Sequence, residues 1–327
     1  MKILVTGSSG HLGEALARTL QGTKHQVLGL DRRASPLTGS VGTITDRDFV
    51  RQCVQGVDAV IHTATLHKPH VATHARHDFV DTNITGTLNL LEEALSAGVS
   101  SFIFTSTTSA FGRALTPPSG APAAWVTEDV RPVPKNVYGV TKTAAEDLCQ
   151  LFHRLHGLAC VVLRTSRFFP EADDDPAVRA AYDDGNVKAN EYLYRRVDLQ
   201  DVVDAHVLAL EKAPSIGFGR YIISATTPFQ PDDLANLRLN APQVVERRVP
   251  EYAEEYARRG WKMFPGIERV YVNERARREL GWQPRYDFRR IIDCLRAGDA
   301  PGSPLARVVG SKGYHDREFA DGPYPVS

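Results

Sequence analysis

Lys2-Ile-Leu-Val-Thr-Gly-Ser-Ser-Gly-His-Leu-Gly13 carries the pattern that decides the fold, an apolar run of strand length followed by GxxGxxG. A helical pattern, His11–Gln21, follows directly, so the glycines lie in a strand-to-helix turn. In such a turn the first glycine permits the tight bend, the second lets the backbone approach a pyrophosphate, and the third allows close helix–sheet contact. The helix N-terminus also offers N–H groups to phosphates. We therefore predict a dinucleotide phosphate loop with contacts from Gly7, Ser9, Gly10, His11, Leu12 and Gly13.

An acidic residue stands where the adenosine ribose of such a cofactor would lie. Asp31 ends the second predicted strand, Val27–Asp31. A carboxylate there can accept hydrogen bonds from the ribose hydroxyls and would repel a 2′-phosphate. Arg32 and Arg33 follow immediately and could attract a 2′-phosphate if they point inward. The balance favours NAD over NADP, with Asp31 and Arg32 among the predicted cofactor contacts.

Strand and helix patterns alternate through the first half of the chain, which implies parallel βαβ units. The predicted strands are Lys2–Thr6, Val27–Asp31, Ala59–Thr63, Ser101–Ser106 and Cys160–Leu163. The predicted helices are His11–Gln21, Asp46–Gln55, Phe79–Ala97 and Tyr138–His156, with Asp46 as an N-cap. The expected fold is therefore α/β, a doubly wound parallel sheet of the Rossmann type.

The pattern becomes less regular after about residue 170. We expect residues 1–170 to form the cofactor-binding domain and residues 171–327 to form mostly a smaller C-terminal, substrate-covering lobe. Within the second part, Asp198–Lys212 is expected to return to the first domain as a helix. No regular element is expected from Pro301 onward, where Gly, Pro and aromatic residues are frequent.

Composition excludes several classes of protein. The 327 residues contain 39 Lys plus Arg and 39 Asp plus Glu, so there is no basic excess of the kind that binds nucleic acid. No apolar run approaches the roughly 18–20 residues of a membrane span, and the N-terminus lacks a signal-peptide pattern. The four cysteines form no CxxC pair, which favours reduced thiols in a cytoplasmic enzyme over disulfides or a metal site.

Tyr138-Gly-Val-Thr-Lys142 gives a second chemical signal, because a spacing of four places Tyr138 and Lys142 on one helical face. A free tyrosine is a poor base at neutral pH. We expect the lysine cation to lower the pKa of Tyr138 toward the working range. The YxxxK spacing is common by chance. It indicates a catalytic pair here because the same chain also has the glycine loop and a predicted strand that ends at Ser106 and Thr107.

With these features in place the sequence resembles the extended short-chain dehydrogenases/reductases, in particular their NAD-dependent epimerase/dehydratase group, which includes the nucleotide-sugar 4-epimerases. The resemblance covers nearly the whole chain. Besides the glycine loop and YxxxK, the matching segments are Val57-Asp-Ala-Val-Ile-His-Thr-Ala64, Asn83-Ile-Thr-Gly-Thr87, Phe102-Ile-Phe-Thr-Ser-Thr107, Asp198-Leu-Gln-Asp-Val-Val-Asp204 and Glu279-Leu-Gly-Trp-Gln-Pro284.

The resemblance implies a role for each matching residue. Tyr138 would be the catalytic acid/base with Lys142 as its partner, and Thr107, or alternatively Ser106, would hydrogen-bond the reacting oxygen. Tyr138 and Lys142 would also contact the cofactor. The further cofactor contacts that it implies are Thr43, Ile44, Ala64, Asn83 and Thr105. The implied assembly is a homodimer formed through the helices 79–97 and 138–156.

Departures from the family pattern narrow the expected chemistry. Thr108-Ser109 stands where 4,6-dehydratases carry Asp-Glu, which argues against water loss. Only about thirty residues lie between Pro170 and Asp198, which is a short cover for a nucleotide. The leading hypothesis is NAD-dependent oxidation and reduction of a secondary alcohol on a sugar or nucleotide-sugar, as an epimerase. The alternative is an NAD-dependent dehydrogenase of a small free sugar or sugar acid, similar to uronate dehydrogenases, and a remote one is a non-catalytic dinucleotide sensor.

Three clusters near the expected substrate site have competing interpretations. His70, His74 and His77 could share a helical face at metal-like spacing, but hydride transfer in the family needs no metal, so we predict none. Substrate contact is assigned to His67, Ser106, Thr107 and Arg167. The acidic run 173–175 is expected to be a solvated loop.

Overall fold

The computed structural model describes residues 1–313, 315 and 319. Its centre is a seven-stranded parallel sheet in the order β3-β2-β1-β4-β5-β7-β8. These strands are β1 (Lys2–Thr6), β2 (Gln26–Asp31), β3 (Ser40–Val41), β4 (Ala59–His62), β5 (Ser101–Thr107), β7 (Ala159–Thr165) and β8 (Phe218–Ile223). The predicted doubly wound parallel sheet is confirmed.

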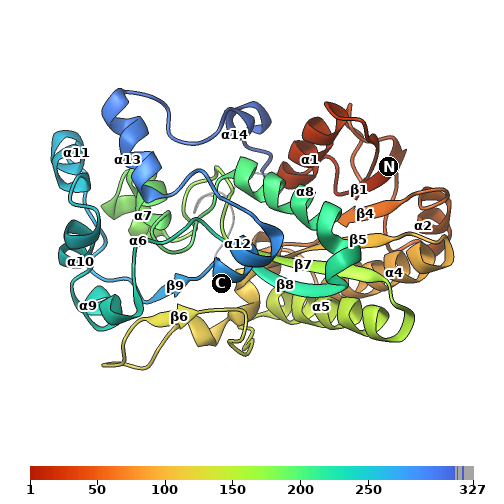
Figure 1. Cartoon of the computed structure of the whole chain (residues 1–327), viewed down its shortest axis with the longest axis horizontal. Coiled ribbons are helices and arrows are strands. Elements are labelled where there is room, and N and C mark those ends of the chain that lie inside the picture. Colours follow the sequence, from red (N-terminus) through yellow and green to blue (C-terminus); the bar gives the residue numbers. More distant parts are fainter. Residues whose placement is uncertain (314, 316–318, 320–327) are drawn as a thin grey trace.

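Helices cover both faces of this sheet (Figure 1). One face carries α1 (His11–Gln21), α8 (Leu199–Ile216), α12 (Glu274–Leu280) and α14 (Pro304–Val309). The other face carries α2 (Arg47–Cys53), α4 (Gly86–Ser96) and α5 (Val137–His156). In β1, Ile3 and Val5 pack into the first core and Leu4 into the second, because successive side chains of a strand point to opposite faces. Burial on both faces explains the nearly continuous apolar strands of the sequence.

The long helical pattern at 79–97 is built from three joined pieces. They are α3 (Arg76–Phe79), the π-helical turn η2 (Val80–Thr85) and α4. Asp46 caps α2 as predicted, with its side chain accepting a hydrogen bond from Phe49 N. The 3₁₀ turns are η1 (Lys68–Ala72), η3 (Thr108–Phe111), η4 (Arg113–Leu115) and η5 (Pro231–Asp233).

A third core lies beyond the carboxyl ends of the strands, and it joins most elements of the second half of the chain. Its helices are α7 (Asp184–Glu191), α9 (Leu234–Leu239), α10 (Ala241–Arg248), α11 (Tyr252–Arg259) and α13 (Phe288–Ala297). A short parallel pair, β6 (Ala124–Val126) and β9 (Arg269–Tyr271), lies beside it, and α6 (Pro176–Ala181) precedes α7. We propose that these elements are the substrate-covering lobe, because β8, α8, α12 and α14 pack with the sheet.

One expectation for the tail is wrong. Residues 304–309 form the helix α14, which starts with Pro304 at a position where no backbone N–H is needed. The Ser303 side chain caps it by accepting a hydrogen bond from Ala306 N. The apolar residues Leu305, Ala306 and Val309 pack on the sheet-side core, which supplies the tertiary support that a six-residue helix needs. The other tail residues of that expectation, 314, 316–318 and 320–327, lie outside the described part of the chain.

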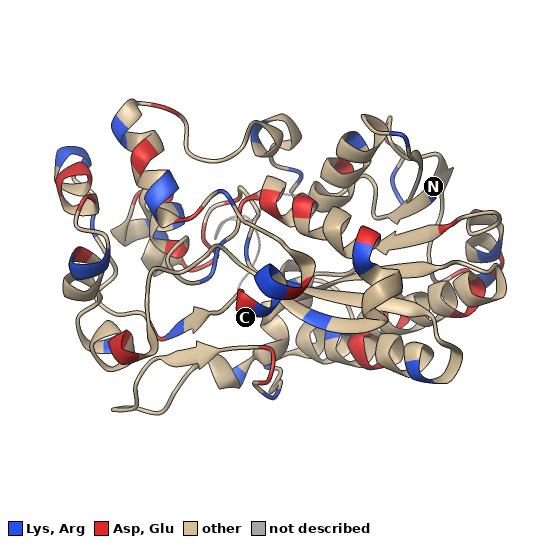
Figure 2. Ribbon diagram, in the orientation of Figure 1, with Lys and Arg blue, Asp and Glu red and all other residues tan. Residues whose placement is uncertain are grey.

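Charged residues lie mainly on helices and loops, and the central strands contain few of them (Figure 2). Within the described residues, no helix is both long enough and apolar enough to cross a membrane.

Candidate active site

The carboxyl ends of the parallel strands open into one large cleft with a volume of about 730 Å³. It lies where the strand order reverses between β1 and β4, which is the position where ligands bind in open α/β sheets. All but two of the residues predicted to contact cofactor or substrate line this cleft. The exceptions are Asn83 and Lys142, which lie behind its wall.

The glycine loop is built as a tight turn under the cleft. Gly7 has a positive φ of 75°, and Gly10 N donates to Gly7 O at 3.0 Å. A Cβ on Gly13 would lie only 1.9 Å from Gly7 O, so the third glycine is needed for the first turn of α1 to pack on the loop. The N-terminal end of α1 therefore faces the cleft without a side chain in the way, which is the arrangement that binds phosphates.

Asp31 lies at the end of β2 and is held by the loop beside it. Its carboxylate accepts hydrogen bonds from Ser9 N at 3.0 Å and from Arg33 N at 2.9 Å. Arg32, Thr43 and Ile44 complete this end of the cleft, and Arg33 lines it as well. The residues predicted for the adenosine half are thus brought together.

Asn83 does not reach the cleft, although the family resemblance placed it among the cofactor contacts. Its side chain is buried and makes four hydrogen bonds within the protein. Oδ1 accepts from Leu66 N at 2.8 Å and from the Thr65 hydroxyl, and Nδ2 donates to Leu66 O and to Thr141 Oγ1 at 3.0 Å. Asn83 therefore fixes the loop after β4 against α5, behind the cofactor-side wall that Ala64 and Leu66 form.

Tyr138 and Thr107 meet in the cleft. Tyr138 comes from the first turn of α5, and Thr107 ends β5. Burial raises the pKa of Tyr138 to about 12, and a hydrogen bond with Thr107 opposes this rise. A phenol with this pKa is protonated at neutral pH, so it can donate a proton to an oxygen bound beside it.

Lys142 does not lower the pKa of Tyr138, so that expectation is wrong for this structure. Its ammonium group donates to Thr105 O at 2.7 Å and lies over the Phe104 ring, 4.0 Å from the ring centre. Burial lowers the pKa of Lys142 to about 7, although Glu146 opposes this change. The lysine is directed at the β5 backbone, and burial sets the direction of the Tyr138 pKa.

The two candidate hydroxyls on β5 have different environments. Ser106 lines the cleft, but its hydroxyl donates to Glu146 Oε1 at 2.5 Å. Glu146 is fully buried and also pairs with Arg164 at 2.6 Å. The Thr107 hydroxyl accepts a hydrogen bond from Ser109 N at 3.1 Å and is near enough to Tyr138 to lower the pKa of its phenol. Glu146 was not predicted as a site residue, although the spacing of Tyr138, Lys142 and Glu146, four residues apart each time, places all three on one helical face.

The histidine-rich stretch does not form one helical face, because it is divided between η1 and α3. His67 lies deep in the site, with its ring 6.2 Å from that of Tyr138, and burial and the neighbouring His70 hold its pKa well below the ordinary value. The His70 and His74 rings are 4.9 Å apart, whereas His77 is exposed. Among the described residues, no group of three or more His, Cys, Asp or Glu side chains is placed to hold a metal ion.

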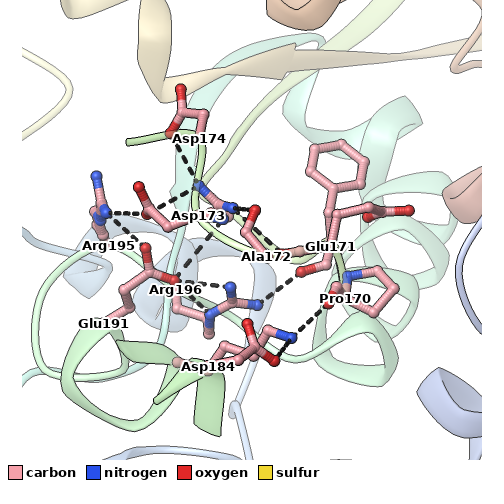
Figure 3. Close-up of polar contacts among 12 residues, drawn as sticks. Pro170, Glu171, Ala172, Asp173, Asp174, Asp184, Glu191, Arg195 and Arg196 are labelled. Carbon is pink, nitrogen blue, oxygen red and sulfur yellow. Dashed lines mark hydrogen bonds and ion pairs between the residues drawn. The ribbon is translucent and has the colours of Figure 1, made fainter. Parts of the chain in front are cut away.

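The acidic run 173–175 is solvated only at Asp175, so the expectation is wrong for its first two residues. Asp173 and Asp174 are buried, and they form ion pairs with the cations around them (Figure 3). Arg167 Nη1 lies 3.4 Å from Asp173 Oδ2 and 3.6 Å from Asp174 Oδ1, and Arg167 Nε lies 3.8 Å from Glu191 Oε2. Its guanidinium also donates to Ala172 O at 2.9 Å. The arginine that sequence reasoning assigned to substrate therefore lines the cleft with carboxylates already around it.

Glu191 is the centre of this network and is fully buried. Burial alone would raise its pKa, yet Arg195, Arg196 and Arg167 outweigh burial and hold the pKa at about 2. Arg195 lies 2.7 Å from Glu191 and 3.0 Å from Asp173. We refer to these six residues, Arg167, Asp173, Asp174, Glu191, Arg195 and Arg196, as the cover network, since they hold the segment between β7 and α8 in place.

A segment near the C-terminus crosses the rim of the cleft. We call residues 311–313 and 315 the C-terminal strap. Lys312 N donates to His11 Nε2 at 3.0 Å, and the Ser311 hydroxyl donates to Glu171 Oε1 at 2.7 Å. His315 Nε2 lies 3.2 Å from Pro69 O on the opposite side. Lys312, Gly313 and His315 line the cleft, and no motif in the sequence indicated this.

The chain is similar to proteins of one large family. The family model described as "NAD dependent epimerase/dehydratase family" matches residues 3–223. A 3 beta-hydroxysteroid dehydrogenase/Delta 5-->4-isomerase of Mycobacterium tuberculosis is 25% identical, over 90% of this chain and 89% of the relative. A 2-alkyl-3-oxoalkanoate reductase of Stenotrophomonas maltophilia is 28% identical, over 92% of this chain and all of the relative.

Other relatives match over a shorter stretch. A UDP-glucose 4-epimerase of Streptomyces lividans is 28% identical in a region that covers 56% of this chain and 56% of the epimerase. Among solved structures, an Agrobacterium tumefaciens short-chain dehydrogenase/reductase superfamily protein with bound NAD has a TM-score of 0.64 at 24% identity, with 94% of this chain and 99% of that one covered. At that identity the likeness shows the fold.

Proposed function

Because the chain belongs to the NAD-dependent epimerase/dehydratase family and is an NAD-dependent enzyme of the extended short-chain dehydrogenase/reductase type, we propose that it interconverts a secondary alcohol and a ketone as a dehydrogenase of a small sugar or sugar acid. The observation that carries the proposal is the buried pair of Tyr138 and Thr107 in the cleft, in front of Lys142.

The residues of the cleft fit an NAD molecule. The turn formed by Gly7 and Gly13 leaves no room for a Cβ, and the free helix N-terminus of α1 lies behind it. Asp31, already oriented by two backbone N–H groups, would hold the adenosine ribose. When bound, NAD supplies the hydride acceptor or donor for the carbon of the substrate.

Tyr138 is proposed to move the proton. In the direction of ketone reduction, its protonated phenol would donate to the carbonyl oxygen, and Thr107 would hold that oxygen by a hydrogen bond. In the direction of alcohol oxidation, the phenol would first release its own proton to water in the cleft, and the phenolate would then accept the hydroxyl proton of the alcohol while the hydride leaves the carbon. Lys142 is proposed to fix the end of β5 by its bond to Thr105 O, and its pKa of about 7 lets it change charge near neutral pH.

The dehydrogenase reading is favoured over the epimerase reading by two observations. The Mycobacterium tuberculosis and Stenotrophomonas maltophilia relatives, which align over nearly their whole length, carry the names of a dehydrogenase and a reductase. The Streptomyces lividans UDP-glucose 4-epimerase aligns over only about half of its length. In addition, the cover network already neutralises Arg167 and Arg195 with carboxylates. These two cations are thus not available to balance the diphosphate of a nucleotide-sugar, which supports a small substrate without a nucleotide.

A second candidate, an epimerase that returns the hydride, is favoured by the C-terminal strap. The strap joins Glu171 and His11 on one side of the rim to Pro69 on the other. A bridge over the rim would slow cofactor release, and an epimerase needs to keep its reduced cofactor between the two half-reactions.

The test is a panel of free sugars, sugar acids and UDP-sugars incubated with NAD, with NADH followed by absorbance and products by chromatography. Net NADH formation supports the dehydrogenase, and product formation without it supports the epimerase. Tyr138→Phe should lower kcat by at least about 1,000-fold while equilibrium binding of NAD is kept. Unchanged turnover in this variant would refute the proposed proton transfer.

We also propose a homodimer formed through α5 and the helix that runs from α3 to α4. The supporting observation is a set of exposed apolar side chains on these helices, Val80, Val140 and Leu155. Sedimentation of the purified protein at several concentrations tests the assembly.

A further inference from the structure

Cations gather at the end of the cleft that lies toward the lobe, and most of them already have acidic partners. Lys68 pairs with Asp174. Arg167 and Arg195 pair with carboxylates of the cover network. Each of these side chains lines the cleft, but its charge is compensated within the protein.

Arg269 is different. It lies on β9 and lines the same cleft, and no carboxylate of the described residues lies within ion-pair distance of its guanidinium. Its Nε is buried and has no hydrogen-bond partner among the described residues. Burying part of a charged group without a partner costs free energy. A bound anion would lower this cost by supplying the hydrogen-bond acceptor and the negative charge that the protein does not place beside Arg269.

The position of Arg269 is fixed by its strand and by the ring of Tyr194. β9 pairs in parallel with β6, with Arg269 opposite Ala124. Arg269 and Tyr271 are two residues apart in a strand, so they share a face, and both line the cleft. The buried ring of Tyr271 stacks on Phe111 with centroids 6.4 Å apart.

That stacking connects Arg269 to the catalytic strand, because Phe111 belongs to η3, which directly follows Thr107. The guanidinium also lies over the Tyr194 ring, 5.8 Å from its centre. The arginine is thus oriented before any ligand arrives. It lies on the lobe side of the cleft, and Figure 1 shows β9 well separated from α1, where the phosphate loop lies.

We propose that Arg269 determines substrate specificity by pairing with an anionic group of the substrate, a carboxylate or a phosphate, while the alcohol carbon lies at Tyr138. A planar guanidinium can bind either group through two parallel hydrogen bonds. This inference rests on the proposed function for the position of the reacting carbon. The sequence predicted Arg167 as the substrate-binding arginine. Arg269 is proposed in its place, because Arg167 is surrounded by carboxylates and Arg269 is not.

The test compares D-glucuronate, D-glucose 6-phosphate and D-glucose, which differ in the presence and kind of anion, as substrates at saturating NAD. The wild type should prefer one of the two anions over glucose, and which one it prefers distinguishes a carboxylate site from a phosphate site. Arg269→Gln should lower kcat/KM for that anion about 100-fold and leave the value for glucose within about 3-fold. Arg269→Lys should recover part of the loss. Arg278→Gln is the matched control, because Arg278 is an exposed arginine that pairs with Glu279.

Two results would overturn the inference even if the enzyme is active. One is a wild type that prefers glucose to both anions, and the other is an equal loss for all three compounds in Arg269→Gln. If no compound is oxidised, the catalytic proposal fails separately. Titration calorimetry of glucuronate and glucose 6-phosphate into the NAD-loaded protein then decides the anion site. Binding that is weakened in Arg269→Gln supports it, and equal binding by both proteins, or none by the wild type, rejects it.

Discussion

Replacing Lys142 by methionine should make the NAD-free protein more stable below neutral pH while abolishing turnover. Burial lowers the pKa of Lys142 from the ordinary 10.5 to about 7. Below pH 7 the lysine is protonated in both the folded and the unfolded chain, so the full cost of burying its charge is present. Between pH 7 and 10.5 only the unfolded chain keeps the proton, and the cost shrinks as the pH rises.

The magnitude follows from the size of this change. At about 1.4 kcal/mol per pKa unit, the buried charge costs about 5 kcal/mol at pH 6 and about 2 kcal/mol at pH 9. The lysine also stabilises the fold through its hydrogen bond to Thr105 O and its contact with the Phe104 ring, which together contribute about 2–3 kcal/mol. Lys142→Met should therefore gain about 2 kcal/mol at pH 6 and nothing, or a slight loss, at pH 9.

The assay is urea unfolding of wild type and Lys142→Met after removal of NAD, at pH 6, 7.5 and 9. Lys24→Met serves as the control, because Lys24 is exposed beyond the end of α1. A gain that does not change with pH would show that the methionine acts through packing alone. A variant less stable than wild type at pH 6 would refute the argument from the buried charge.

Four other substitutions test the cleft. Gly13→Ala should abolish NAD binding measured by calorimetry, because its Cβ would lie 1.9 Å from Gly7 O; binding within threefold of wild type would contradict the close packing of the loop. Thr107→Ala should lower kcat about 100-fold, whereas Ser106→Ala, whose hydroxyl is bound to a buried carboxylate, should mainly lower the unfolding midpoint; the reverse pattern in steady-state kinetics would exchange the two roles. Asp31→Ala should raise the NADP-to-NAD ratio of kcat/KM by about tenfold or more, and an unchanged ratio would show that its carboxylate does not select the cofactor.

The parts of the site that could be predicted from the sequence are those that depend on local spacing. The phosphate loop requires glycines at fixed offsets between a strand and a helix, and Tyr138 and Lys142 lie one helical turn apart. Both patterns depend only on residues that are close together in the sequence. The sheet could be predicted for the same reason, since each strand is a short apolar run between helical patterns.

The parts that could not be predicted depend on contacts between distant residues. Arg167 looks like a free cation in the sequence, but folding places Glu191 beside it. The acidic run 173–175 looks solvated, and the approach of Arg167, Arg195 and Lys68 makes the burial of Asp173 and Asp174 possible. Arg269 carries no motif at all, and its distinction is the absence of an acidic partner among the described residues.

The C-terminal strap also bears on how the protein is made. The hydrogen bond between Lys312 and His11 joins residues 301 positions apart. A ribosome adds roughly 5–20 residues per second, so the phosphate loop is made some tens of seconds before the segment that completes its rim. During that interval the nascent chain can form the sheet around β1 and β4, but its cleft has an open edge. Cofactor captured by the growing chain before residue 312 is made would be held less tightly than cofactor bound after the strap has formed, because the contacts of Lys312 with His11 and of Ser311 with Glu171 would still be missing.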